Sequence, residues 1–238
     1  MLTKKLTYLL FSMLACHASS TLAQSPALAQ SDSLLLRDYQ FVRQQDVWLT
    51  SPNAAALTRF SAANIAEAEV CLSTVHGGLV DYYQSMHVLQ ADVYAEAFHR
   101  LNSRTVVAGG ISYENFSGRD MSGSVFMASE RLPFNIADDS LTNAGRKHRD
   151  TYQLHGAVGF DVYHGISLGA RLDYTAANYA KYKDLRHKNK LMSLDVSLGV
   201  YVPLLSWLSV GGNYTYHRQT ESLDFATYGK SEKVYRSE

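Results

Sequence analysis

The feature that most restricts the fold of this chain is a strict alternation of apolar and polar residues that recurs in one long stretch after another. In residues 89–98, Leu89, Val93 and Ala97 share one face of an extended strand, whereas Asp92 and Glu96 share the other. Side chains of a β-strand alternate between the two faces of a sheet with a period of two residues. The pattern therefore predicts strands with one apolar and one polar face.

Alternation of this kind occurs in seven stretches, the first of them weaker than the rest: residues 66–75, 89–98, 104–114, 152–162, 166–175, 192–202 and 208–217. Most are longer than the usual strands of soluble sheets, which have about five or six residues. They match the roughly 10-residue strands that cross a membrane at a tilt. The sequence predicts an all-β fold, an antiparallel transmembrane β-barrel with about seven strands present.

The predicted connections between these strands alternate in length. Short turns are expected at 101–104, 164–165 and 203–206, and long polar loops at 117–150 and 178–190. Outer-membrane barrels have short periplasmic turns and longer outer loops. Four tyrosines on the apolar faces lie toward the long loops, as an aromatic girdle requires: Tyr113, Tyr174, Tyr214 and Tyr216.

A soluble barrel or sandwich is the alternative architecture, with the apolar faces inside and the polar faces in water. The polar faces of the predicted strands contain many Gly, Ser and Ala residues and few Lys residues. This composition is unlike that of a fully solvated surface, and it favours the membrane barrel.

The N-terminus has the pattern of a secretory signal peptide, residues 1–23. Lys4 and Lys5 precede an apolar run at 6–15, which is too short to span a bilayer. Cleavage after Ala23 is preferred, and cleavage after Ala29 is the alternative. The sequence therefore predicts export and location in the outer membrane.

The two cysteines and the charge balance limit the possible partners. Lipidation at Cys16 is an alternative that Met13 and His17 disfavour, and only Cys71 remains after cleavage, so no internal disulfide is expected. Cleavage removes two of the 22 basic residues and none of the 22 acidic ones, leaving a formal charge of −2. Without a basic excess, no nucleic-acid partner is expected.

Residues 24–64 are predicted to form an N-terminal lead or plug segment, irregular or briefly helical, ahead of a partial barrel at 65–238. The segment has no clear alternation, and Pro52 suits the first turn of a short helix at 53–60 or the position just ahead of it. After Gln30 no apolar run approaches the roughly 18 residues of a transmembrane helix.

Several motifs resemble an uncharacterised family of outer-membrane β-barrels, a domain of unknown function. The resemblance covers nearly the whole mature chain, and the motifs that carry it are WLTSPNAAAL (48–57), GGLVDYYQS (77–85), NFSG (115–118), DYTAANYAK (173–181) and KDLRH (183–187). The stretch at 52–54 also resembles the entry segment of fatty-acid-transporter-type barrels, which implies a neighbouring plug. Members of the family continue beyond the position of Glu238, and single-chain bacterial barrels have an even number of at least eight strands. The resemblance thus implies that this chain is an N-terminal fragment.

Charged residues on the predicted polar faces are candidate lumen-facing residues: Asp92, Glu96, Glu114, Asp161, Arg171, Asp173 and Asp195. They are interpreted as a constriction that selects solutes, because rings of charged side chains govern passage through pores. The alternative is a wall of paired, solvated charges.

A second candidate site is a basic outer loop formed by Lys181, Lys183, Arg186, Lys188 and Lys190. Its charges could meet the phosphates of a surface glycolipid or an anionic ligand. The alternative is a solvated loop without a ligand.

No enzyme activity, cofactor or metal site is expected. Ser197 or Ser209 with His155 or His217 would be available to a hydrolase, the third and weakest hypothesis, and no histidine pair has the spacing of metal ligands. The first hypothesis is a porin-like channel or transporter for a small or amphipathic solute, and the second is a surface-interaction protein that uses its long outer loops. The expected partners are outer-membrane lipid and the barrel-insertion machinery, with a solute or surface glycolipid.

Overall fold

The computed structural model describes part of the chain: residues 51–60, 64–77, 84–127, 132–138, 143–227 and 236–237. All of these lie in the second of two units of the chain, Trp48–Glu238. The predicted signal peptide at 1–23 lies outside the described residues, as does the predicted lead up to residue 50.

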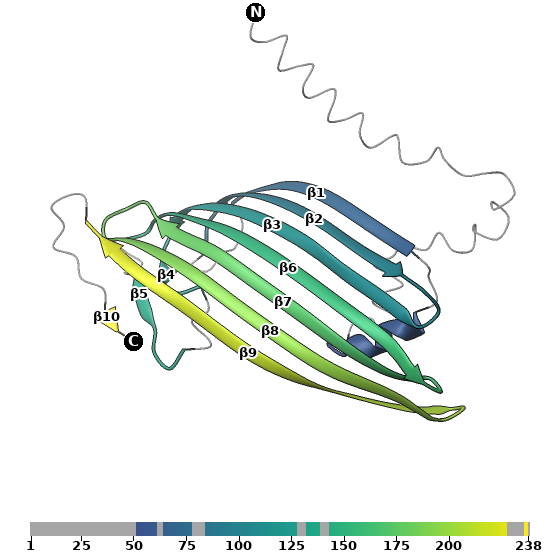
Figure 1. Cartoon of the computed structure of the whole chain (residues 1–238). Coiled ribbons are helices and arrows are strands. Elements are labelled where there is room, and N and C mark those ends of the chain that lie inside the picture. The colour runs from purple at the N-terminus through teal and green to yellow at the C-terminus, as the bar shows by residue number, and fades with distance from the viewer. Residues whose placement is uncertain are drawn as a thin grey trace, which may run out of the picture. The chain divides into compact units, whose positions relative to one another are not determined.

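Seven antiparallel strands form one curved sheet in which chain neighbours pair side by side (Figure 1). Its strands are β1 (Asn64–His76), β2 (His87–Arg100), β3 (Thr105–Met121), β6 (Gly145–Tyr163), β7 (Ile166–Lys181), β8 (Arg186–Leu205) and β9 (Leu208–Ala226). Each corresponds to one of the seven alternating stretches, and the predicted all-β, antiparallel fold is confirmed.

The sheet is open among the described residues. Its order is β1-β2-β3-β6-β7-β8-β9, so β1 and β9 are its edges, and no closed barrel is found. The strands have 13 to 20 residues and are longer than the alternating stretches, because pairing continues past the point where apolar residues end. No helix among the described residues is long and apolar enough to cross a membrane.

The two faces of the sheet differ in both chemistry and exposure. The pairing register places Val70, Val93, Tyr113 and Tyr152 in one row of the apolar face. Large side chains on this face are open to the surroundings, with relative exposures of 73% for Val70, 61% for Leu198 and 73% for Tyr214. Soluble monomers rarely expose a continuous apolar surface of this kind.

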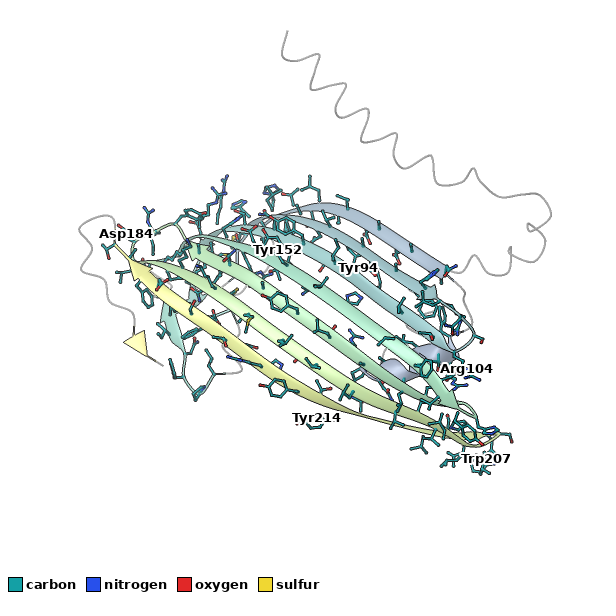
Figure 2. The ribbon with its side chains drawn as sticks, in the orientation of Figure 1. Tyr94, Arg104, Tyr152, Asp184, Trp207 and Tyr214 are labelled. Carbon is teal, nitrogen blue, oxygen red and sulfur yellow. The ribbon has the colours of Figure 1, made fainter. Side chains whose placement is uncertain are left out.

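Short turns join the strands at one end of the sheet, the short-turn end, where Figure 2 shows Arg104 and Trp207. The side chain of Asn102 accepts hydrogen bonds from the backbone N–H groups of Arg104 and Thr105, both at 2.8 Å. His164 and Gly165 have φ angles of 47° and 81°, which two-residue hairpins with primed turns require. Both turns were predicted from the sequence.

The third turn differs from the prediction. β8 continues through Pro203 to Leu205, so the turn is Ser206-Trp207 rather than 203–206. The register shifts between Pro203 and Leu205. An irregularity of this kind accommodates proline, which has no N–H to donate to the ladder.

The opposite end of the sheet, the long-loop end, includes Asp184 (Figure 2). The connection from β3 to β6 is long, as predicted, and contains β4 (Gly123–Ser124) and β5 (Ile136–Asp138), which pair in a small sheet with β10 (Arg236–Ser237). The prediction of a long loop at 178–190 is wrong. β7 and β8 pair through Ala180 and Lys188, and only residues 182–185 connect them.

Candidate functional site on the polar face

A short 3₁₀ helix, η2 (Ala54–Arg59), begins immediately after Asn53, whose side chain caps it by accepting a hydrogen bond from the backbone N–H of Ala55 at 3.1 Å. Asparagine is favoured at this position because its side chain satisfies an N–H group that has no partner within the helix. Pro52 precedes the cap. The helix predicted at 53–60 is therefore confirmed in a tighter form.

The helix lies against β6, β7 and β8 near the short-turn end (Figure 1). Three glycines form a strip beneath it on the polar face. The register places Gly159, Gly169 and Gly199 side by side on β6, β7 and β8. A Cβ atom at Gly169 would lie 2.1 Å from the backbone nitrogen of Ala55. One at Gly199 would lie 2.0 Å from the side-chain oxygen of Asn53. The strip therefore lets the helix backbone approach the sheet more closely than any side chain permits.

Polar groups fix the helix on this strip. The amide nitrogen of Asn53 donates to the carbonyl oxygens of Val200 at 2.9 Å and Gly212 at 3.3 Å. The hydroxyl groups of Thr58 and Ser167 are hydrogen-bonded at 2.9 Å. The helix is thus tied to β7, β8 and β9.

Two arginines and an aromatic pair hold the other end of the helix. Arg59 forms an ion pair with Asp161 at 2.8 Å. Arg100 donates to the carbonyl oxygen of Phe60, whose ring packs edge-on against Phe98 with 5.0 Å between centroids. Ala54, Ala55 and Ala56 are buried in this arrangement. We name Ser51–Phe60 the docked segment, since it covers the polar face at the short-turn end.

Four residue positions farther along each strand, a second feature crosses the polar face. The register aligns one ionisable residue on each of six strands, with Gly110 between them on β3: Glu67, Glu96, His155, Asp173, Asp195 and His217. A Cβ atom at Gly110 would lie 2.7 Å from the ring of His155, so this glycine gives the imidazole its space. We call this set the ionisable row.

Contacts within the ionisable row are short. His155 Nε2 lies 3.4 Å from a carboxylate oxygen of Glu96, and His217 Nδ1 hydrogen-bonds Asp195. Arg171 binds Asp173 with two nitrogens, each at 2.7 Å. Four carboxylates and Arg171 together give a formal charge of −3 when both histidines are neutral. The row therefore favours cations over anions.

The predicted lumen-facing residues all lie on this polar face. Glu96, Asp173 and Asp195 belong to the ionisable row, and Arg171 is next to it. Asp161 binds the docked segment through Arg59. Asp92 and Glu114 pair directly across β2 and β3, nearer the long-loop end. Both have partners, because Gln90 donates to Asp92 at 3.1 Å and Arg149 pairs with Glu114.

The prediction of a basic outer loop is wrong, because only Lys183 of its five residues lies in a connection between strands. Lys181 ends β7 and is only 2% exposed, and Arg186 begins β8 and pairs with Asp184 at 2.9 Å. Lys183 donates to the carbonyl oxygen of Ala144 at 2.9 Å. Lys188 and Lys190 are exposed in β8. These five residues therefore do not form one open basic surface.

The hydrogen bonds described for this part of the chain do not pair the serine and histidine residues considered for a hydrolase. Ser197 is buried, and its hydroxyl bonds Thr215 at 2.7 Å rather than a histidine. In the part of the chain that the structure describes, no group of three or more His, Cys, Asp or Glu residues could hold a metal ion.

Sequence reasoning missed the glycine strip. The signal was present, since Gly159, Gly169 and Gly199 all fall on polar faces of the alternating stretches. What the sequence did not give is the strand register that aligns them. Glu67 and His217 were likewise not among the lumen-facing candidates.

Comparison with known families identifies this chain as a member of a family of unknown function, DUF6850, whose sequence model matches residues 54–238. The match begins at the first residue of η2 and includes the whole sheet. Comparison with curated proteins and with solved structures gave no match.

Proposed function

We propose that this member of DUF6850 is an outer-membrane β-barrel protein that provides a passage for small, preferably cationic, solutes. In this proposal the apolar face contacts lipid and the polar face lines the passage. The docked segment closes the passage at the short-turn end.

The observation that carries the proposal is the exposure of the apolar face. Leu72, Ile111, Leu168 and Leu198 on four different strands have exposures of 50% to 74%. Full exposure of an apolar side chain of this size to water is unfavourable by about 1.5–3 kcal/mol relative to burial, and these side chains are half to three-quarters exposed. In lipid the same face is favourable, and antiparallel strands pair their backbone groups internally, as a membrane requires.

Exposed aromatic residues support this interpretation. Tyr152 and Tyr163 lie near opposite ends of the apolar part of β6, with exposures of 50% and 68%. Eleven residues of strand span about 36 Å, and a tilt of about 45° reduces this to about 26 Å across the membrane. That span is close to the roughly 25 Å height of the apolar band in outer-membrane barrels.

The polar face supports a passage rather than a filled core. The ionisable row crosses all the strands but β3 at one level, and rings of acidic side chains favour cations in pores. The docked segment occupies a different level of the same face, nearer the short turns. A selective level and a closing segment are thus separate parts of one wall.

The proposal requires closure of the open sheet. Backbone groups at an unpaired strand edge are unfavourable in lipid. Since β1 and β9 are edges among the described residues, each of these two strands has to pair along its open edge in the membrane.

Cell fractionation tests the proposal. The full-length protein is expressed in a Gram-negative host, and the membranes are separated by density and extracted with detergent. We expect the protein in the outer-membrane fraction, released only by detergent, and ion conductance when it is reconstituted in planar bilayers. Recovery from the periplasm without detergent would reject the membrane interpretation.

A further inference from the structure

A pocket of about 720 Å³ lies at the long-loop end of the polar face. Its walls come from β9 and from the connection between β3 and β6: His217, Gln219 and Glu221 on one side, and Phe126, Leu132 and Phe134 on the other. Pockets that enclose small organic molecules have volumes of about 300–1,000 Å³. His217 also belongs to the ionisable row, so the pocket adjoins that row.

A carboxylate in the polar wall is held in a fixed position. One oxygen of Glu221 accepts hydrogen bonds from the side-chain amide of Asn189 at 2.6 Å and from the backbone N–H of Met127 at 3.0 Å. Its other oxygen is buried and has no hydrogen-bond partner in the described part of the chain.

The charge of Glu221 is not balanced by a basic side chain within the described residues, where none of the ion pairs includes it. A buried or partly buried charge without an opposite charge beside it is unfavourable. A cation in the pocket would offset this charge. An anion would be repelled by Glu221, and also by the carboxylate of Asp195, which is hydrogen-bonded to the pocket residue His217.

The other wall is aromatic. The rings of Phe126 and Phe134 are arranged edge to face, with centroids 5.9 Å apart and an angle of 79° between their planes. Aromatic faces carry negative partial charge and attract cations, and they also pack well against a second ring. Leu132 adds apolar surface beside them.

We propose that this pocket binds a small organic cation that has an aromatic body and an ammonium group. The body packs against Phe126 and Phe134, and the ammonium group lies on the side of Glu221. The inference goes beyond the proposed function, because binding to the detergent-solubilised protein requires neither a closed barrel nor passage through it.

A series of three probes of similar shape tests the charge requirement. Binding of 2-phenylethylammonium, 2-phenylethanol and phenylacetate to the full-length protein in detergent is measured by isothermal titration calorimetry at neutral pH. We expect the ammonium compound to bind roughly tenfold more tightly than the alcohol, and phenylacetate to bind weakest. Equal affinities, or tighter binding of phenylacetate, would overturn the proposal without bearing on the outer-membrane location.

Matched variants locate the binding site. Glu221→Gln retains an acceptor for Asn189 and Met127 and removes the charge, so it should remove the preference for the ammonium compound. Phe134→Leu should weaken binding of the ammonium compound and the alcohol together. Asp224→Asn, on the same strand three residues away and exposed, removes the same charge outside the pocket and should change neither.

The calorimetric outcomes for these variants are decisive in both directions. If the ammonium preference survives in Glu221→Gln, or is lost equally in Asp224→Asn, the pocket does not supply it and the assignment is wrong. The probe series on the unmodified protein gives an answer even where a variant fails to fold.

Discussion

The hydroxyl oxygens of Thr58 and Ser167 lie 2.9 Å apart and join the docked segment to the third strand of the sheet from its β9 edge. Both side chains are buried, and Ser167 also accepts a hydrogen bond from Arg59 at 2.9 Å. This contact lies between residues separated by 109 positions in the chain. It therefore offers a direct way to fix the docked segment to the wall of the proposed passage.

A disulfide at this contact should lock the passage closed. In a Cys71→Ser background, Thr58→Cys and Ser167→Cys place two sulfur atoms where the hydroxyl oxygens now meet, close enough for a bond if the backbones adjust slightly. We expect single-channel openings in planar bilayers to be rare under oxidising conditions and to return after addition of dithiothreitol.

The Cys71→Ser protein with only one of the two added cysteines is the control, and its conductance should not respond to dithiothreitol. If the cross-linked protein conducts as well as the reduced one, the docked segment has no closing role.

Substitution in the glycine strip should displace the docked segment. A methyl group at Gly169 would meet backbone atoms of Ala54 and Ala55, which cannot move aside as a flexible side chain can. We expect Gly169→Ala to lower stability by about 1–3 kcal/mol, as overpacking does. In liposome-swelling assays, solute entry should become faster.

Gly156→Ala is the matched control, because no atom lies within 4 Å of the position that a Cβ atom would occupy there. Its stability and swelling rate should stay close to those of the unmodified protein. The interpretation of the strip fails if the two alanine variants behave alike.

The sequence predicted the sheet well because alternation is a local property. The type of each residue and its position in the alternating pattern suffice to assign Val158 to the apolar face and Gly159 to the polar face. The short helix was also predictable, since Pro52 and Asn53 are local signals for its start. These predictions were correct because each depends only on residues within a few positions of one another in the sequence.

The candidate site was less predictable because it depends on register between strands. Asp195 and His217 are 22 residues apart, and only the pairing of β8 with β9 places them opposite each other. The prediction of the basic loop was wrong for a related reason. Polar residues such as Asn189 and Lys181 are typical of loops, but here their side chains are buried against other polar groups. With 182–185 as the actual connection, the surface-interaction hypothesis retains only one of its two long loops.

A charge on the apolar face should be far more damaging than one on the polar face if the surroundings of the apolar face are lipid. Leu198 is 61% exposed on the apolar face of β8, and Gln153 is exposed on the polar face of β6. We expect Leu198→Arg to destabilise the protein in bilayers by about 2–4 kcal/mol, the range for arginine near the midplane. Gln153→Arg should change stability by less than about 0.5 kcal/mol, as at most surface positions.

Urea titration of the protein folded into lipid vesicles measures both values. Since both side chains are open in the fold itself, packing does not explain a difference between the variants. Equal, small effects would show that the apolar face is not in contact with lipid.

Charge in the ionisable row should set the ion preference of the passage. Asp195→Asn removes one of four carboxylates and keeps an oxygen that can accept the hydrogen bond from His217. A unit negative charge about 5 Å away in water stabilises a cation by about 0.8 kcal/mol and destabilises an anion by about the same amount, so it changes the cation-to-anion preference by a factor of about 16. The reversal potential across a bilayer with unequal salt concentrations measures this preference directly.

Asp224→Asn, which removes a charge from an exposed position outside the polar face, should leave the reversal potential unchanged. The effect should weaken at 1 M salt, where charges are screened over about 3 Å. A reversal potential that is the same in Asp195→Asn and the unmodified protein would mean that ions do not pass close to the row.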